Sequence, residues 1–335
     1  MRPAACSTTT ARVVLGAVLC ALCLGGCGDR LGLPQEPDDS GVPIGEIAYV
    51  VQYRWSNLPA ITDVVLASGI LFAIEDQTRV RAYLSDKAEP VVNAGFSFPD
   101  TVIVDDEHLQ QPIQLAVGSG STLWVAFQLP DLRILEFALG SPPRPTGQWV
   151  AGNRIGALGG MAVDTNPDSG YVYLSDAQGN SIAKYAPSAV GGRRVVVLST
   201  AGRGDTFVMQ PRGLFFFNDS LLVADAMNNR IQVIHAHEPL SGRGEVLDVS
   251  GEPLGLRAPT DVWRDRAGLF YVAESGRVTQ VTTLGLIKEV VTELDPEAAT
   301  SPSSVVANNT QVWVPDPDRK TLTVYQINTV AENLP

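Results

Sequence analysis

The chain has few of the residues that carry the commonest catalytic and metal-binding chemistry. All four cysteines lie within the first 27 of 335 residues, so the rest of the chain must fold without disulfides. Two of the three histidines, His235 and His237, alternate along one predicted strand, but no third metal ligand accompanies them. No serine lies in a nucleophile-elbow context, and no glycine-rich phosphate loop precedes a predicted helix. The usual sequence evidence for serine hydrolases and nucleotide-binding enzymes is therefore missing.

Positive charge is also scarce. The chain has 24 lysines and arginines against 36 acidic residues, a net charge of −12. Residues 1–26 contain two of the arginines, so the remainder carries 22 basic residues and a net charge of −14. A nucleic-acid-binding protein needs a basic stripe or patch, and none is present. This charge excludes nucleic acid as a partner and argues against electrostatic attachment to anionic lipid head groups.

Long apolar runs are absent except near the N-terminus. Residues 1–12 carry Arg2 and Arg12 and no acid, and a twelve-residue apolar segment, Val13 to Leu24, follows. This segment is too short to span a bilayer as a resident helix. The pattern of a basic start, a short apolar core and small residues after it predicts a secretory signal peptide.

The end of this segment, Leu24-Gly25-Gly26-Cys27, resembles the bacterial lipobox. The resemblance implies a signal peptide at residues 1–26 and acylation of Cys27, which becomes the first residue of the mature protein. Residues 27–44 would then form a lipidated, flexible tether, because residues 29–42 are polar and contain proline and glycine. Two or three acyl chains anchor a protein firmly. The alternative is an ordinary signal peptide with an incidental cysteine.

Lipidation would place the protein on a membrane of the bacterial cell envelope, exported and either periplasmic or surface-exposed. The residue after Cys27 is Gly28 and not aspartate. By resemblance to Gram-negative sorting, this favours the outer membrane.

After the tether, a unit of about fifty residues recurs along the chain. The residue that closes the second apolar run of each unit marks the register, and the markers are Glu75, Phe127, Asp176, Asp225, Glu274 and Asp316. Recurrence at this period is typical of repeat architectures, in which one unit cannot bury its own apolar face and packs on its neighbours. The sequence therefore contains six copies of one structural unit.

Each unit contains short apolar segments separated by Gly, Pro, Asn and Asp, the pattern of short strands joined by tight turns. No stretch after residue 26 shows a sustained helical period. Four strands per unit and six units predict an all-β, six-bladed β-propeller of four-stranded antiparallel blades over residues 45–328, followed by a tail at 329–335. The sixth unit ends after its third strand, Thr321–Ile327, whereas Ile47–Tyr53 belongs to no unit. We expect these two strands to pair, closing the ring and hiding exposed edges. A closed propeller is expected to be a monomer.

The fourth unit carries a family resemblance. Its segments Pro211-Arg212-Gly213, Val223-Ala224-Asp225 and Asn228-Asn229-Arg230-Ile231-Gln232-Val233 resemble an NHL repeat. The units at 161–185 and 259–281 match less closely, and the others depart further. The resemblance implies an NHL-like propeller whose relatives mostly bind or scaffold other molecules, while a minority of related propellers are lactonases or lyases.

The acidic markers at the strand ends are interpreted as structural. Asp176, Asp225, Glu274 and Asp316 each precede a turn that contains glycine or asparagine. A carboxylate in this position accepts hydrogen bonds from turn N–H groups, or meets an arginine such as Arg230. Repetition in successive blades is what a structural role predicts.

The candidate site is a ring at the central channel, where the first strands of the blades begin. Aligning these strands gives the ring Asp63, Gln114, Gly160, Gly213, Asp261 and Ser304. Carboxylate and amide oxygens are ligands that Ca²⁺ or another divalent cation prefers, so Asp63, Gln114 and Asp261 are metal-ligand candidates. Arg212, beside the ring, could instead meet an anionic ligand.

Two hypotheses follow. The first is a lipid-anchored propeller without a cofactor that binds an envelope protein, peptide or glycan. The alternative is a lactonase-like hydrolase or a lyase that uses a divalent metal at the channel mouth.

Overall fold

The computed structural model describes residues 47–85, 96–97, 103–104, 107–119, 122–140, 143–166, 170–236, 244–247, 255–281, 287–292, 295 and 297–329. A compact unit spans Tyr49–Asn328. The predicted signal peptide, Cys27 and the tether lie outside the described residues, as do His237 and residues 330–335 of the predicted tail. Within the described part of the chain, no helix is both long and apolar enough to cross a membrane.

The described structure contains six four-stranded antiparallel sheets, and each corresponds to one predicted blade. Blade 1 contains β2 (Ile61–Ala67), β3 (Ile70–Glu75), β4 (Arg79–Leu84) and β5 (Phe96–Ser97). Blade 2 contains β8 (Gln110–Val117), β9 (Thr122–Leu129), β10 (Arg133–Ala138) and β11 (Arg144–Ala151). Blade 3 contains β12 (Leu158–Val163), β13 (Val172–Asp176), β14 (Ser181–Ala186) and β15 (Arg193–Ser199).

Blade 4 contains β16 (Pro211–Phe217), β17 (Ser220–Asp225), β18 (Arg230–His235) and β19 (Gly244–Leu247), with a single 3-10 turn, η1 (Ala226–Asn228), between β17 and β18. Blade 5 contains β20 (Asp261–Arg264), β21 (Phe270–Glu274), β22 (Arg277–Val281) and β23 (Ile287–Val290). Blade 6 contains β24 (Val306–Ala307), β25 (Gln311–Asp316), β26 (Thr321–Thr329) and β1 (Ile47–Trp55).

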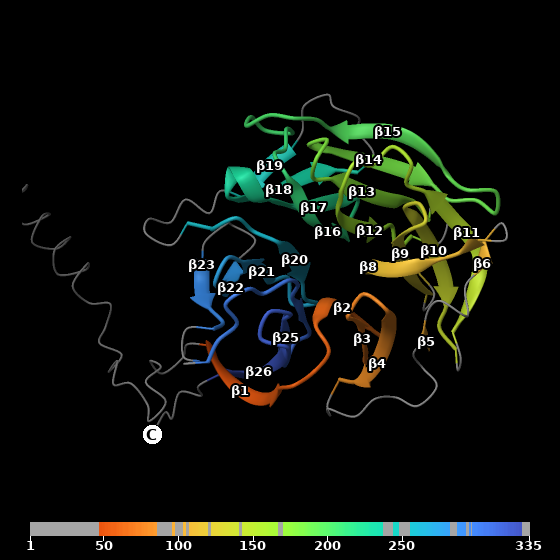
Figure 1. Ribbon diagram of the computed structural model, residues 1–335. Coiled ribbons are helices and arrows are strands. Elements are labelled where there is room, and N and C mark those ends of the chain that lie inside the picture. The colour runs from red at the N-terminus through yellow and green to blue at the C-terminus, as the bar shows by residue number, and fades with distance from the viewer. Residues whose placement is uncertain are drawn as a thin grey trace, which may run out of the picture. The chain divides into compact units, whose positions relative to one another are not determined.

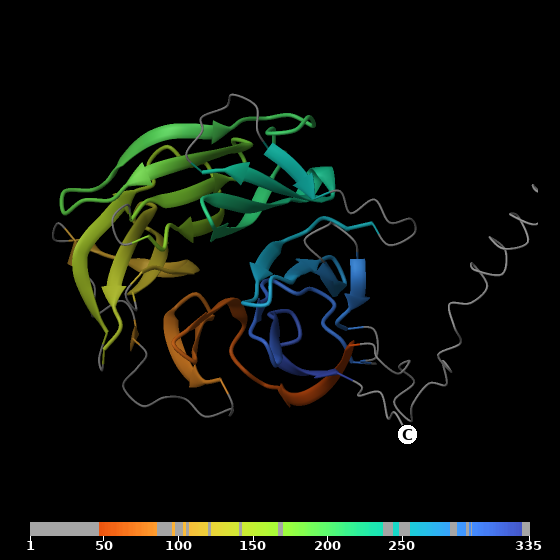
Figure 2. The same ribbon diagram turned by 180° about the vertical axis from the view of Figure 1, so that it is seen from behind.

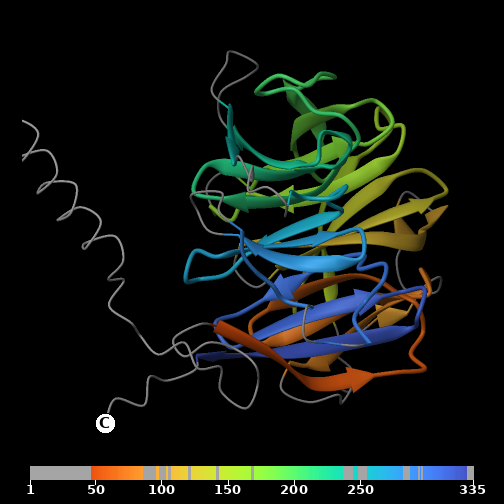
Figure 3. The same ribbon diagram turned by 90° about the vertical axis from the view of Figure 1, so that its left-hand side faces the viewer.

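The blades form a closed ring with their first strands innermost (Figures 1 and 2). Strands β2, β8, β12, β16, β20 and β24 each contact the first strand of both neighbouring blades. Seen from the side, the sheets are stacked face to face and twisted relative to one another (Figure 3). This arrangement is the predicted six-bladed propeller.

The ring closes as predicted. Strand β1 from the start of the described residues pairs with β26 from their end, which gives blade 6 the order β1-β26-β25-β24. The outer strand of this blade therefore comes from the N-terminal side, and its three inner strands come from the C-terminal side. Pairing removes the open edge that β26 would otherwise expose.

Apolar side chains between adjacent blades form the core. The second strand of each blade is buried on both faces, and all five residues of β13 and all five of β21 are buried. Such strands read as continuous apolar runs because they have no solvent-facing side. One cluster joins blades 1 and 2 through residues such as Phe72, Leu115 and Phe127. Phe127 thus fills the core where other blades have a strand-end carboxylate.

The strand-end carboxylates hold the turns of their blades, as the sequence predicted. Glu75, Asp225, Glu274 and Asp316 are fully buried, and Asp176 is nearly so. Asp225 accepts hydrogen bonds from the Met209 backbone N–H at 2.7 Å and from Arg230 Nε at 2.8 Å. Asp176 accepts backbone N–H groups from turns on both sides of its strand. Asp176 and Asp225 therefore take part in turn hydrogen bonds, as a structural role requires.

One element was not expected. The acidic connection between blades 1 and 2 contains a small hairpin of β6 (Ile103–Val104) and β7 (Glu107–His108). Its strands are only two residues long, too short to show an alternating pattern in the sequence.

Candidate functional site

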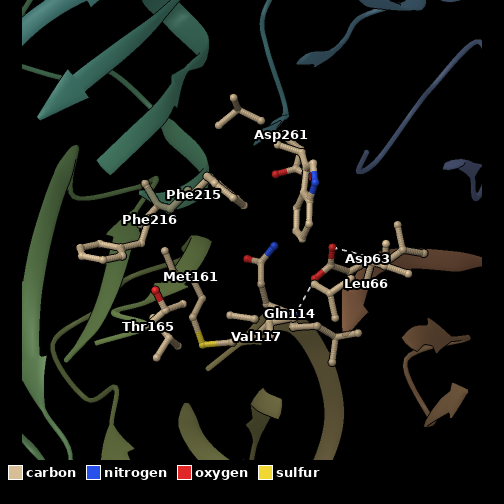
Figure 4. Close-up of a pocket in the computed structure, with 18 residues that line it drawn as sticks. Asp63, Leu66, Gln114, Val117, Met161, Thr165, Phe215, Phe216 and Asp261 are labelled. Atoms are coloured by element: carbon tan, nitrogen blue, oxygen red, sulfur yellow. Dashed lines mark hydrogen bonds between the residues drawn. The ribbon is translucent and has the colours of Figure 1, made fainter. Parts of the chain in front are cut away.

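The centre of the ring contains a cavity of about 240 Å³. Its lining comes from the inner strands of blades 1 to 5, and it is apolar except for a few polar groups. Three of those polar groups are the ring residues Asp63, Gln114 and Asp261, whose side chains are directed toward the same space (Figure 4). These three residues were selected by aligning the blades in the sequence. They lie 51 or more positions apart in the chain, yet they line one cavity.

Asp63 is fixed at the junction of blades 1 and 2. It lies on β2 and is 5 % exposed. Its Oδ1 accepts the Val64 backbone N–H at 2.9 Å, and its Oδ2 accepts the Leu115 backbone N–H at 2.6 Å. Leu115 follows Gln114 on β8. The carboxylate thus joins two inner strands and holds its own side chain against the cavity.

Asp261 has the same role at the junction of blades 5 and 6. Its Oδ2 accepts the Ser304 hydroxyl at 2.7 Å and the Val305 backbone N–H at 3.0 Å. Ser304 is 1 % exposed, so this predicted ring residue is a buried donor to Asp261 and does not line the cavity. A carboxylate on one inner strand and a backbone N–H on the next form a repeated device for joining blades.

Both carboxyl groups have raised pKa values, and burial is the main cause. Burial, followed by the nearby charge of Asp261, raises the pKa of Asp63 to about 8. Burial also raises the pKa of Asp261 to about 6, against the hydrogen bonds from Ser304 and Val305 that favour its charged form. Near neutral pH, Asp63 is therefore mostly protonated and Asp261 mostly ionised. The cavity then carries about one negative charge.

No positive side chain compensates this charge from within the cavity. Among the described residues that line it, none is lysine, arginine or histidine. The remaining wall is largely apolar and includes Leu66, Phe215 and Trp263. Phe215 and Trp263 meet with ring centroids 4.9 Å apart at 60°, and the indole Nε1 donates to the Ala307 carbonyl at 2.8 Å. The aromatic wall is thus held in place from outside the cavity.

The two ring glycines have a packing role. A Cβ built on Gly160 would lie 2.3 Å from the Arg212 carbonyl oxygen, and one on Gly213 would lie 2.2 Å from Asp261 Oδ1. Both positions bring neighbouring inner strands into close backbone approach, which only glycine allows. They therefore set the radius of the ring and offer no ligand.

Arg212 lies away from the central cavity. Its exposed side chain lines a separate depression with Gln210, Met227 and Ser275. Its role in meeting an anionic ligand stays a prediction, and such a ligand would lie in this depression and not in the central cavity.

The cavity fits a divalent cation poorly. Ca²⁺ takes six to eight oxygen ligands, whereas the ring supplies two carboxylates and one amide. Both oxygens of Asp63 and one oxygen of Asp261 already accept protein hydrogen bonds. No group of three or more His, Cys, Asp and Glu side chains suited to a metal occurs in the described residues. The metal site at Asp63, Gln114 and Asp261 stays a prediction that the donor set does not favour.

Sequence reasoning missed the apolar side of the site. Phe215 and Trp263 lie two residues beyond the ring positions Gly213 and Asp261 on their strands, so they alternate onto the same side. Stepping forward by two from each aligned position could have identified them. Their apolar character instead suggested ordinary blade core.

No family model and no curated protein matches the sequence. The structure resembles a protein of unknown function from Bacteroides thetaiotaomicron with a TM-score of 0.59 and 13 % identity, covering 85 % of this chain and 72 % of that one. It also resembles a catalytically inactive virginiamycin B lyase from Staphylococcus aureus, crystallised with quinupristin, with a TM-score of 0.51 and 12 % identity over 86 % and 92 % of the two chains. A nidogen/laminin complex matches with a TM-score of 0.46 and 18 % identity over 69 % and 79 %. At these identities the likeness is one of fold.

Proposed function

We propose that this chain is a lipid-anchored binding protein of the bacterial cell envelope, whose propeller holds a small ligand or a ligand segment in its central cavity. The observation that carries the proposal is the cavity itself. Its walls are apolar, and a few fixed polar groups converge in it, which is the usual composition of a small-molecule site. The NHL-like motifs of blade 4 agree with a binding role, because that family mostly binds or scaffolds.

Anchoring rests on the lipobox-like Leu24-Gly25-Gly26-Cys27 and on the polar segment after it. Its test is metabolic labelling with a palmitate analogue, followed by membrane fractionation. We expect the wild type to be labelled and to sediment with outer membranes, and Cys27→Ala to lose the label. Cys23→Ala, four residues earlier, is the matched control and should keep it. Labelling that survives Cys27→Ala would overturn the anchor assignment.

Cavity binding is tested by a ligand-observed NMR screen of small aromatic compounds of positive, neutral and negative charge. Leu66→Trp adds volume to a partly exposed residue of the cavity wall and should abolish binding. Val190→Trp is the control, because Val190 is 89 % exposed and lines no part of the cavity. Compounds that bind wild type and Leu66→Trp equally would show that the cavity is not the site.

The alternative is a hydrolase or lyase with a divalent metal at Asp63, Gln114 and Asp261. The specific observation in its favour is that these three residues converge on one cavity. It predicts stoichiometric metal in the purified protein that is lost in the double variant Asp63→Ala/Asp261→Ala. Metal analysis by mass spectrometry distinguishes the two functions.

A further inference from the structure

We propose that the central cavity selects an organic monocation: a protonated amine or similar group on an apolar body about the size of one aromatic ring. This proposal rests on the proposed function, because it assumes that the cavity binds a ligand. It adds the chemical class of that ligand.

Charge is the first argument. Asp63 and Asp261 both face the cavity, and no lysine, arginine or histidine is present among the described lining residues. A carboxylate held in a low-dielectric space without a counter-charge is unfavourable, and a bound cation would relieve that cost. One carboxylate is ionised near neutral pH and the other is mostly protonated, since their pKa values are about 6 and about 8. A single positive charge therefore balances the site.

The walls supply the second argument. Phe215 and Trp263 present aromatic surface on the same cavity as the carboxylates. Aromatic faces attract organic cations and pack against apolar ligand bodies. The Gln114 amide is directed into the same space (Figure 4), where its carbonyl can accept a hydrogen bond from an ammonium group. Carboxylate, amide and aromatic groups together suit an amine with an apolar body.

Size is the third argument. A cavity of about 150 Å³ is known to hold benzene, and this cavity has about 240 Å³. The extra space accommodates a short chain that ends in an ammonium group. A bare divalent ion would leave most of the space and its apolar wall unused.

The test uses three probes of nearly equal size: phenethylamine, 2-phenylethanol and phenylacetate, together with Mg²⁺ and Ca²⁺ alone. Binding to the full-length protein is measured by titration calorimetry and by the shift in thermal midpoint. We expect phenethylamine to bind at least tenfold more tightly than the alcohol, and phenylacetate not to bind. Asp261→Asn should remove the preference for the amine over the alcohol. Asp205→Asn, an exposed acidic residue outside the cavity, is the control and should retain the preference.

The outcomes distinguish a failure of cation selectivity from a failure of the proposed cavity binding. Equal binding of amine and alcohol, both blocked by Leu66→Trp, would keep cavity binding and overturn the cation selectivity. Binding of none of the organic probes, with stoichiometric binding of a metal ion, would overturn both in favour of the metal enzyme. Because the comparison among probes is made on the wild type, it holds even if Asp261→Asn fails to fold.

Discussion

The stability of the folded protein should fall as pH rises from 5 to 9, and Asp63 should be the main cause. A carboxyl whose pKa is higher in the folded state binds its proton more tightly there than in the unfolded chain. Its contribution to stability is therefore greatest at low pH and declines as pH rises from the unfolded value of 3.8 to the folded value of about 8. Well above pH 8 the contribution is constant, because both states are then ionised.

The magnitude follows from the width of that window. Between pH 5 and pH 8, at about 1.36 kcal/mol per pH unit, the free energy of unfolding should decrease by about 4 kcal/mol. This is a large share of the roughly 5–15 kcal/mol that stabilises a typical domain. Asp63→Asn should abolish the decrease. It should also cost about 1–3 kcal/mol at every pH, because its NH₂ would replace an oxygen that accepts a backbone N–H.

Urea denaturation followed by tryptophan fluorescence at pH 5, 7 and 9 provides the measurement. The quantity of interest is the difference in unfolding free energy between Asp63→Asn and wild type, which should increase by about 4 kcal/mol from pH 5 to pH 9. Asp205→Asn controls for removal of a surface charge and should follow the wild-type curve. Parallel curves for wild type and Asp63→Asn would refute the account of two coupled, buried carboxyl groups.

Three further predictions concern two ring residues and one strand-end carboxylate. Gly213→Ala should lower stability by about 1–3 kcal/mol or more, since the new methyl group would overlap Asp261, whereas Gly255→Ala, where a Cβ meets nothing within 4 Å, should be nearly neutral in the same thermal melts. Asp225→Ala should cost about 1–3 kcal/mol, because it removes the acceptor of the Met209 backbone N–H and of the partly buried Arg230, and denaturation at wild-type urea concentrations would contradict the turn-holding role. Ser304→Ala should raise the pKa of Asp261 by removing a donor to its charged form, which carboxyl NMR titration would detect as a shift in its midpoint.

Much of the fold could be predicted because every blade has the same two structural requirements. A strand buried on both faces must be apolar along its length, and a strand that ends at a turn needs an acceptor for the turn N–H groups. Both requirements are visible in the sequence of blade 4, where the apolar run Leu221 to Ala224 is followed by Asp225. The same pattern recurs in other blades. Closure by β1 and β26 followed from counting strands, since one unit lacked a strand and one strand lacked a unit.

The site was harder to predict because its residues differ in how clearly the sequence marks them. Asp63, Gln114 and Asp261 are polar residues in apolar strands, so aligning the blades was enough to find them. Their partners Leu115 and Val305 contribute only backbone N–H groups, which any residue type could supply. Phe215 and Trp263 resemble core residues in sequence, because an aromatic side chain has the same composition signal whether it faces a neighbouring blade or an open cavity. Whether such a side chain faces a neighbouring blade or the cavity depends on the radius of the ring. Close packing at the ring glycines sets that radius, and no local sequence pattern indicates it.

The way the blades join also bears on why carboxylates face the cavity at all. Blades 3 and 4 meet through the Ser175 hydroxyl, which donates to the Arg212 carbonyl, and blades 4 and 5 meet through a backbone bond from Gly213 to Thr260. Neither of these two inner-strand hydrogen bonds uses an ionisable group. Joining inner strands therefore does not require an aspartate such as Asp63 or Asp261, and burying them makes the fold less stable as pH rises. A ligand that neutralises the cavity would recover this loss, and ligand binding and folding would then be linked through the same two carboxyl groups.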